Sequence, residues 1–418
     1  MVEAVLAIPL LVLGFLIYLL FFERGPTYSI LKRPLASSGL GLLSSWRTLL
    51  SLPSSTLDRA EVFASGLGFY DHHARMIASA KSSIHLESYI LEPGQSCQRL
   101  MKALAIQAQA GVEVRVLLDR IGSFKVRRRH LEELRQAGGE VEFYHPLGVH
   151  SFRRFNNRSH RNLLIIDGSQ ALIGGAGIAD FWDREVDAWY DTAISVFGTV
   201  ACRLQAVFCE HWREATGEIL ADEKLFPRIN DSSQQIPCLV VGSSPITGGS
   251  SPARLLYQLA LASAQHSIDL CTPYFIPDRG IREALIAAAK AGVQTRVMTS
   301  GPYSDHSLAR RAGRRRYGSL LKNGVDLYEY RDQMMHSKSL IIDGRCVIVG
   351  STNIDNRSFN LNDEVNLAIE DTDLAAIYAD QFEVDLAQSN RITMQDWLDR
   401  SWRERTLAYL GRWLERHD

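Results

Sequence analysis

The sequence predicts an α/β fold of two tandem repeats, each a mixed β-sheet flanked by helices, after an N-terminal transmembrane helix. Three observations lead to this prediction. An uncharged apolar stretch fills residues 4–22, the order of elements over residues 59–220 recurs over residues 221–390, and one histidine-led motif occurs in each of these two regions.

Residues 1–23 are predicted to be a transmembrane anchor, because the stretch 4–22 is long enough to cross a bilayer. A cleaved signal peptide is the alternative. It is disfavoured because no lysine or arginine precedes the stretch and no small-x-small cleavage site follows it. Basic residues from Arg24 to Arg47 follow, so the positive-inside rule predicts a single N-terminal pass with the body of the chain in the cytoplasm.

Residues 24–58 form a predicted linker that is rich in proline, serine, glycine and leucine. Its apolar residues include Leu40, Leu42, Leu43, Trp46, Leu49 and Leu50. Two readings stay open for them: an amphipathic segment lying on a membrane, or a linker packed on the folded domain.

The two repeats are recognised by matching segments in matching order. The matches are Ser83–Tyr89 with Ser267–Tyr274, Gly111–Val116 with Gly292–Val297, and Val141–Tyr144 with Leu327–Tyr330. Alanine-rich helical stretches precede the middle pair. Strands that alternate with helices favour an α/β sandwich in each repeat.

The motif of the second repeat reads His336-Ser-Lys338-Ser-Leu-Ile-Ile-Asp343. Side chains alternate along a strand, so His336 and Lys338 share one face. The apolar run 339–342 predicts a buried strand, Asp343 and Gly344 a turn, and Cys346–Val349 a returning strand.

The first repeat carries a weakened copy, His160-Arg-Asn162-Leu-Leu-Ile-Ile-Asp167. A glycine-led turn follows each copy, with the residues Gly350, Ser351 and Asn353 in the second and Gly174, Gly175 and Gly177 in the first. Imidazole, ammonium and neutral donors suit a phosphate undergoing transfer. A single such motif is more often an ordinary polar strand end, but its duplication favours a phosphodiester site.

Composition describes an ordinary globular chain. It is 46% hydrophobic and 22% charged with a formal net charge of −1, so any attraction to anions arises from local patches. Six cysteines form no Cys-x-x-Cys pair, which favours buried free thiols over disulfides or zinc ligands. The tail 391–418, with tryptophans and arginines near helical spacing, predicts an amphipathic helix that either lies at a membrane or packs on the second repeat.

The duplicated motif with its Gly-Ser-x-Asn turn resembles the phospholipase D superfamily. Thr272–Asp278, Tyr328–Tyr330 and Gly350–Glu364 resemble bacterial cardiolipin synthases of the phospholipase D type, and the similarity spans everything after residue 59. The resemblance implies transfer of a phosphatidyl group from one phosphatidylglycerol to another at the inner membrane. It also implies that no metal or other cofactor takes part.

The resemblance gives each motif residue an expected role. One of His160 and His336 attacks the phosphorus to form a phosphohistidine, and the other acts as general acid and then base. The groups expected to hold the phosphate are Lys338, Ser351, Asn353, Asn162 and Gly175.

Four carboxylates complete the expected catalytic set. Glu364 is expected to orient His336, and Asp191 to orient His160. For Asp167 and Asp343 a catalytic role and a structural role in the turn are both open.

The first motif departs from the family pattern, because Asn162 stands where lysine is expected and Gly177 where the second motif has Asn353. A neutral amide supplies no ammonium charge. Arg158, which shares strand parity with His160, is the expected substitute cation. We also expect Asn162→Lys to leave activity unchanged or to raise it.

Phospholipids and the membrane are the expected partners, with phosphatidylglycerol and also phosphatidylethanolamine as substrates. Three basic runs, at 125–129, 153–158 and 310–316, are either headgroup contacts or solvated surfaces. A near-zero net charge disfavours nucleic acid. A lipid hydrolase, another phosphatidyltransferase, an endonuclease and a degenerate scaffold remain the alternatives to the synthase.

Overall fold

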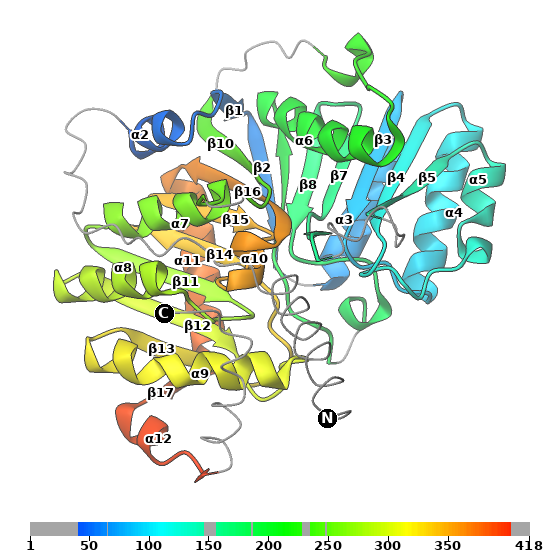
Figure 1. Cartoon of the computed structure of the whole chain (residues 1–418). Coiled ribbons are helices and arrows are strands. Elements are labelled where there is room, and N and C mark those ends of the chain that lie inside the picture. The colour runs from blue at the N-terminus through cyan, green and yellow to red at the C-terminus, as the bar shows by residue number, and fades with distance from the viewer. Residues whose placement is uncertain are drawn as a thin grey trace, which may run out of the picture.

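The computed structural model describes residues 41–64, 66–145, 156–184, 187–227, 235–246 and 249–402. Within these ranges the strands form two mixed sheets, one of seven strands and one of ten, which lie side by side with helices on their faces (Figure 1). The predicted mixed α/β fold with two similar halves is therefore confirmed. No helix in these ranges is long and apolar enough to cross a membrane, and the predicted anchor over residues 1–23 lies outside them.

The sheet of the first half has the strand order β2-β9-β8-β7-β3-β4-β5. Its strands are β2 (Arg59–Phe63), β3 (Ser83–Ser88), β4 (Glu113–Asp119), β5 (Glu140–Tyr144), β7 (Leu163–Ile166), β8 (Gln170–Gly174) and β9 (Ala193–Phe197). The helical segments of this half are α3 (Gly66–Ser79), α4 (Gln95–Gln109), η1 (Arg128–His130), α5 (Glu132–Gln136), η3 (Asp180–Trp182), α6 (Thr199–Thr216) and η4 (Glu223–Leu225). β3, β4 and β5 run parallel, and the other neighbours are antiparallel.

The second sheet repeats this plan in the order β1-β10-β16-β15-β14-β11-β12-β13-β17, with β6 paired to β16. Its strands are β1 (Ser55–Leu57), β6 (Arg158–Ser159), β10 (Ile236–Ser243), β11 (Ser267–Thr272), β12 (Gln294–Ser300), β13 (Asp326–Tyr330), β14 (Ser339–Ile342), β15 (Cys346–Gly350), β16 (Asn362–Glu370) and β17 (Ser389–Ile392). Its helices are α2 (Leu42–Leu49), α7 (Pro252–Ser263), α8 (Arg279–Lys290), α9 (Ser307–Lys322), α10 (Asn356–Asn360), α11 (Thr372–Ala387) and α12 (Met394–Leu398). β11, β12 and β13 are again the parallel strands.

Local sequence accounts for the motif strand and for several helix starts. The run 339–342, with leucine and two isoleucines, is fully buried and forms β14 as predicted. Asp278 and Asp371 cap α8 and α11, since each carboxylate accepts a hydrogen bond from a backbone N–H in the first helical turn.

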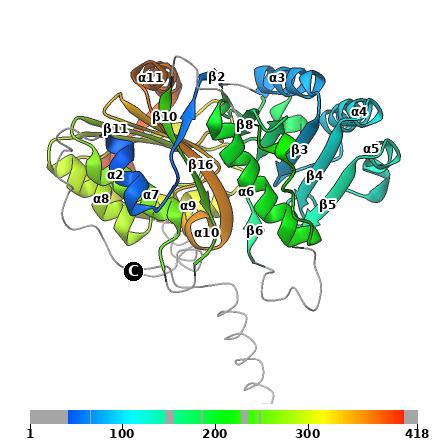
Figure 2. The same cartoon turned by 90° about the horizontal axis from the view of Figure 1, so that it is seen from above.

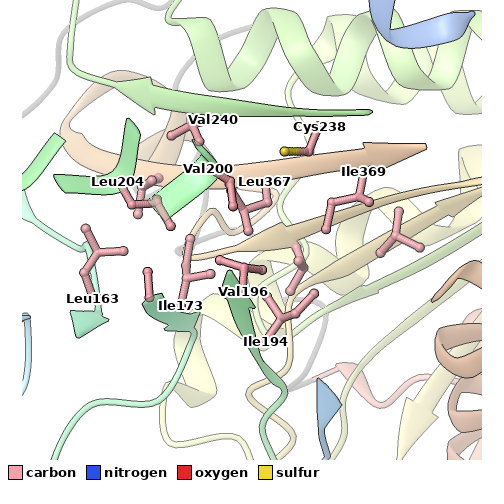
Figure 3. Close-up of a cluster of buried hydrophobic side chains, with 14 of the residues drawn as sticks. Leu163, Ile173, Ile194, Val196, Val200, Leu204, Cys238, Val240, Leu367 and Ile369 are labelled. Atoms are coloured by element: carbon pink, nitrogen blue, oxygen red, sulfur yellow. The ribbon is translucent and has the colours of Figure 1, made fainter. Parts of the chain in front are cut away.

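Helix α6 joins the two halves through a shared apolar core. It runs along the junction of the sheets (Figure 2), and Leu204 and Phe208 on it are fully buried. Figure 3 shows Leu204 in one cluster with Ile194 of the first sheet and with Val240 and Leu367 of the second. Because burial of these side chains is the dominant stabilising term, each half depends on the other for part of its core.

Backbone pairing also crosses between the halves. β6, which belongs to the first half in sequence, lies parallel to β16 of the second, with Arg158 opposite Asn362 and Ser159 opposite Asp363. The strand β6 ends directly before His160. The first motif is therefore held against the second sheet by its own backbone.

The described part of the predicted linker packs on the second half. Leu43 and Trp46 of α2 are buried in its core, and the Trp46 Nε1–H donates to Ser263 Oγ at 3.2 Å. This supports the packed reading for residues 42–46, while Leu49 remains 61% exposed.

The predicted tail helix is wrong at its start. Arg391 lies in β17, where it pairs with Tyr328 of β13, and the helix α12 begins only at Met394. The edge strand β13 offers backbone hydrogen-bond partners to this segment. Pairing with that strand prevails over the helical preference that the spacing of the tryptophans indicates. Residues 403–418 lie outside the described residues.

Candidate active site

Both motif histidines stand directly before the strands that carry their motifs, and each is fixed by backbone from the other half. The His160 N–H donates to the carbonyl oxygen of Asp363 at 2.8 Å. The His336 N–H donates to the carbonyl oxygen of Tyr190 at 2.6 Å. These contacts hold the two histidines in one shared site.

The site is a pocket of about 320 Å³ lined by residues from both halves, including His160 and His336. The first half contributes Tyr89, Asn162, Gly175, Gly177, Trp182 and Trp189. The second contributes Tyr274, Asp305, His306, Asn353, Asp355, Asn356, Arg357 and Asn362. The prediction that the two motifs face each other is consistent with this geometry.

Each histidine has a buried carboxylate at Nδ1, but the pairing is crossed. Glu364 Oε2 lies 3.0 Å from His160 Nδ1, and Asp191 Oδ2 lies 2.8 Å from His336 Nδ1. The expected pairing within each half was wrong. Both carboxylates follow the returning strand of their own motif, at the edge of the sheet that faces the opposite half, so the nearer imidazole is the one across the pocket.

Both carboxylates are themselves held by hydrogen bonds. The Ser351 hydroxyl donates to Glu364 and accepts from the Val365 N–H at 3.1 Å, while the Thr192 N–H donates to Asp191 Oδ1 at 2.8 Å. Ser351 does not line the pocket, so the expected phosphate contact for this residue was wrong. Its hydroxyl instead fixes the partner of His160.

Lys338 lies behind His336 and is only 1% exposed. Its Nζ donates to the His336 carbonyl oxygen at 2.6 Å and lies 2.9 Å from His336 Nδ1. Burial, and then the Lys338 ammonium, lowers the pKa of His336 to about 4. The His336 imidazole is therefore neutral near pH 7, as a nucleophile or a general base requires.

Asn162 occupies the lysine position of the first motif but serves the backbone around it. Its Nδ2 donates to the Gly175 carbonyl oxygen at 3.1 Å, and its Oδ1 accepts from the Tyr89 N–H at 3.2 Å. It also accepts from Ser88 Oγ at 3.2 Å. Asn162 therefore ties the end of β3 to the glycine turn.

Arg158 was expected to replace the missing ammonium, and the structure contradicts this. Its side chain is 1% exposed and absent from the pocket lining, and its Nη1 lies 3.7 Å from Asp119 Oδ1. Its Nη1 also donates to the carbonyl oxygen of His145 at 3.4 Å. Arg153 and Arg154 lie outside the described residues.

Asp167 and Asp343 lie at the far ends of β7 and β14, away from the pocket, so a catalytic role for them is wrong. Asp343 accepts from the N–H groups of Gln265, His266 and Ser267 at 2.7 to 3.0 Å. Asp167 does the same for the N–H groups of residues 81–83. Both are turn residues that fasten the motif strand to its antiparallel neighbour, β3 or β11.

The glycine turns approach the reacting groups closely. A side chain at Gly175 would meet the Asp191 carboxylate and the Lys338 ammonium within 2.7 Å, so only glycine fits there. In the second turn the Asn353 side chain lines the pocket, and its amide oxygen has no hydrogen-bond partner among the described residues. An amide in this position is free to bind a ligand oxygen or hydroxyl.

The aromatic wall of the pocket was not predicted. The rings of Trp182 and Trp189 lie 5.4 Å and 5.6 Å from the His336 ring, and Tyr89 lies 5.1 Å from His160. For Trp182 and Trp189, the one sequence signal that pointed to the pocket was their position between the glycine turn of the first repeat and Asp191. In the ranges that the structure describes, no group of three or more His, Cys, Asp or Glu residues is arranged to hold a metal ion.

Two histidine half-sites that share one pocket, carried on two copies of one mixed sheet, define an enzyme of the phospholipase D superfamily. The chain matches the family described as cardiolipin synthase, PLD-like domain, over residues 74–212 and 258–386. It therefore belongs to this family of phosphatidyltransferases, and the predicted resemblance is confirmed.

Individual relatives agree with this assignment. A cardiolipin synthase of Halalkalibacterium halodurans is 32% identical over 364 residues, which cover 86% of this chain and 72% of that protein. Cardiolipin synthase 1 of Staphylococcus epidermidis is 36% identical over 349 residues, which cover 80% of this chain and 69% of that protein. The crystal structure of phosphatidylserine synthase from Haemophilus influenzae Rd KW20 shares the fold, with a TM-score of 0.69 at 13% identity over 89% of this chain and 96% of that one.

Proposed function

We propose that this chain transfers the phosphatidyl group of one phosphatidylglycerol to a second, through a phosphohistidine intermediate, and so forms cardiolipin and releases glycerol. The observation that carries the proposal is the pair of pocket histidines, each with Nδ1 on a buried carboxylate. Such a carboxylate keeps the proton on Nδ1 and leaves the Nε2 lone pair for the substrate.

In the first step one imidazole Nε2 attacks the donor phosphorus, and the bond from phosphorus to the glycerol oxygen breaks. The opposite histidine begins the cycle as an imidazolium with a proton on each ring nitrogen. It gives its Nε2 proton to that oxygen, so glycerol leaves as a neutral alcohol. The partner carboxylate, Glu364 for His160 or Asp191 for His336, stabilises the charge that its imidazole acquires.

In the second step the acid of the first step acts as a base. It takes the proton from the hydroxyl of the second phosphatidylglycerol, the alkoxide oxygen attacks phosphorus, and the bond from phosphorus to histidine breaks. Both histidines return to their starting protonation states, so the cycle needs no external proton.

Charge on the phosphorus oxygens needs donors close to the reacting histidines. The Asn353 amide and the backbone of Gly175 in the pocket lining, and Lys338, which is buried beside His336, are the proposed groups. Asn162 contributes indirectly, because it holds the Gly175 carbonyl group and Tyr89 in place.

The proposed setting is the bacterial inner membrane. Residues 1–23 would form the anchor, 24–58 the linker, 59–220 and 221–390 the two repeats and 391–418 the tail, with the catalytic body in the cytoplasm. The uncharged stretch over residues 4–22 and the basic residues after it support this arrangement. Phosphatidylethanolamine is a second proposed donor, and no nucleic acid partner is proposed.

Mass spectrometry of lipids tests the proposal after the purified chain is incubated with phosphatidylglycerol liposomes. We expect cardiolipin and free glycerol, both abolished in His336→Ala and both retained in His266→Ala, which changes an exposed histidine outside the pocket. Phosphatidic acid alone would identify a lipid hydrolase. No turnover, even with phosphatidylethanolamine added, would refute the synthase and favour a nuclease or a scaffold.

A further inference from the structure

The two walls of the pocket differ although the halves repeat one plan. Ile178 and Ile354 occupy equivalent positions, since each follows its glycine turn and each forms a parallel bridge, to Leu91 and to Phe275 respectively. The chain after these two positions lines the pocket from opposite sides. Residues at equal distance beyond them can therefore be compared one to one.

The first half provides an aromatic wall beyond Ile178. Trp182 and Trp189 line the pocket beside His336. The residue three positions after Ile178 is Phe181, whose ring packs 4.5 Å from that of Trp182. Of the described residues after Ile178 in this half, the ones that line the pocket are uncharged.

The second half provides a polar wall beyond Ile354. Asp355 caps α10 by accepting from the Ser358 N–H at 2.8 Å, and Arg357 stands where the first half has Phe181. The Arg357 side chain lines the pocket, is exposed, and donates from Nη1 to Asn156 Oδ1 at 3.2 Å. Asn156 belongs to the first half, so the guanidinium bridges the two halves beside the pocket that it lines.

Among the described residues that line the pocket, Arg357 is the one arginine, and none of them is a lysine. Lys338 lies behind His336, with its ammonium on the carbonyl oxygen of that residue. The pocket thus has one cation next to the reacting histidine and a second, in its lining, that the chemistry at phosphorus does not use.

We propose that Arg357 binds the phosphodiester of the acceptor lipid. The inference rests on the proposed function, in which the acceptor is itself a phosphatidylglycerol. Its reacting hydroxyl is separated by a single glycerol from its own anionic phosphodiester, so two phosphates occupy the site during the second step. Two like charges at this distance repel unless each has a cation, and the planar guanidinium matches phosphate oxygens in pairs.

A small neutral acceptor separates the two steps experimentally. Ethanol carries no phosphate and captures the phosphatidyl group as phosphatidylethanol, so its product reports donor activation alone. Cardiolipin formed in the same incubation reports use of the lipid acceptor. The measured quantity is the ratio of cardiolipin to phosphatidylethanol, by mass spectrometry, with the full-length chain and phosphatidylglycerol liposomes containing ethanol.

Arg357→Gln is expected to lower this ratio by roughly ten- to a hundredfold, the range for loss of a charged hydrogen bond. Arg357→Lys should recover part of it, and Arg331→Gln, an exposed arginine outside the pocket, should leave it unchanged. An unchanged ratio, or an equal fall of both products, in Arg357→Gln overturns the inference while the synthase stands. Phosphatidylethanol without cardiolipin from the unmodified chain overturns the proposed function, and the acceptor subsite with it.

Discussion

The two motif histidines occupy unlike surroundings although their sequences match. His336 has Lys338 beside it, and the pKa of His336 falls to about 4 because of burial and that ammonium. At the same place beside His160 stands Asn162, whose amide is bonded to the backbone of its own half. Among the described residues, no cation takes the lysine position beside His160, so the two histidines have different electrostatic surroundings there.

The crossed pairing of histidines and carboxylates gives a first prediction. Asp191→Asn should shift the imidazole ¹⁵N signals of His336, and Glu364→Gln those of His160, because each amide replaces the anionic acceptor of one Nδ1–H and can present an NH2 donor to that nitrogen instead. Each change should lower kcat by on the order of ten thousandfold, the scale seen for the orienting aspartate of a serine protease. If Asp191→Asn shifted the signals of His160 and Glu364→Gln those of His336, the crossed pairing would be refuted in favour of pairing within each half.

A second prediction concerns Asn162, which is 8% exposed. Asn162→Lys should lower both activity and the thermal midpoint, because it removes an acceptor from the Tyr89 N–H and buries a second ammonium near Lys338. This reverses the expectation from sequence alone. Asn162→Ala, without the added charge, should be milder. Wild-type stability with raised activity in the lysine variant would vindicate the original expectation.

At the level of residues, the spacing of the duplicated motif predicted the histidines and Lys338. The family resemblance implied Glu364 as an orienting carboxylate, and Asp191 was expected as its counterpart after His160. The sequence could not assign the carboxylates to their histidines. That assignment depends on how the two halves pack against each other. The alternation of side chains along one strand says which residues share a face of that strand, but not which residues of the other sheet lie opposite. For the same reason the sequence did not predict a role for Arg357. It stands in the segment after the second motif, but its neighbours in the other half are not known from the sequence.

Among the secondary-structure elements, the two strand–turn units are the most closely matched parts of the repeats. Asp167 and Asp343 follow β7 and β14 with φ of 50° and 54°, in the left-handed region that aspartate tolerates better than most residues. Each carboxylate accepts hydrogen bonds from three successive N–H groups at the start of the adjacent antiparallel strand. The aspartate of the motif is thus a structural fastener.

Asp343→Ala should therefore destabilise the chain without changing the chemistry of the molecules that remain folded. The loss should be about 2–4 kcal/mol, from hydrogen bonds to a charged acceptor and from alanine at positive φ. Asp343→Asn, which keeps one acceptor oxygen and tolerates this backbone, should lose less. Denaturant titration gives the stability, and kcat per folded molecule should match wild type. A kcat loss with full stability would return Asp343 to the catalytic set.

The strands of the motifs were predictable because branched apolar runs between turns have few alternatives. Two other strands were not. β6 covers two residues, Arg158 and Ser159, and exists only because β16 of the other half accepts it. β17 lies at the start of a segment whose spacing of tryptophans and arginines predicts a helix. Its residues form a strand instead, because they pair with β13.

At the scale of the whole molecule, buried neutral histidines make stability depend on pH. Burial lowers the pKa of His73, His85 and His336 from 6.5 to about 4. Between pH 4 and pH 6.5 the unfolded chain binds more protons than the folded one. The contribution of these histidines to the free energy of unfolding is therefore fully present above about pH 6.5 and is lost as the pH drops toward 4.

The thermal midpoint should accordingly be lower at pH 5 than at pH 7. His85→Gln should show a smaller difference between the two, since glutamine retains the polar contact with Gln205 but binds no proton. Differential scanning fluorimetry at both pH values measures this. Equal midpoints at pH 5 and pH 7 in the unmodified chain would show that these imidazoles are not held neutral.

The strand β6, hydrogen-bonded into the sheet opposite its own, has a consequence for turnover. The halves cannot swing apart like jaws without breaking that ladder and the bond from the His336 N–H to Tyr190. We therefore expect the pocket to keep nearly the same width through the reaction cycle. Under the proposed function, glycerol then leaves through the same opening by which the acceptor lipid enters, and the two cannot occupy it together.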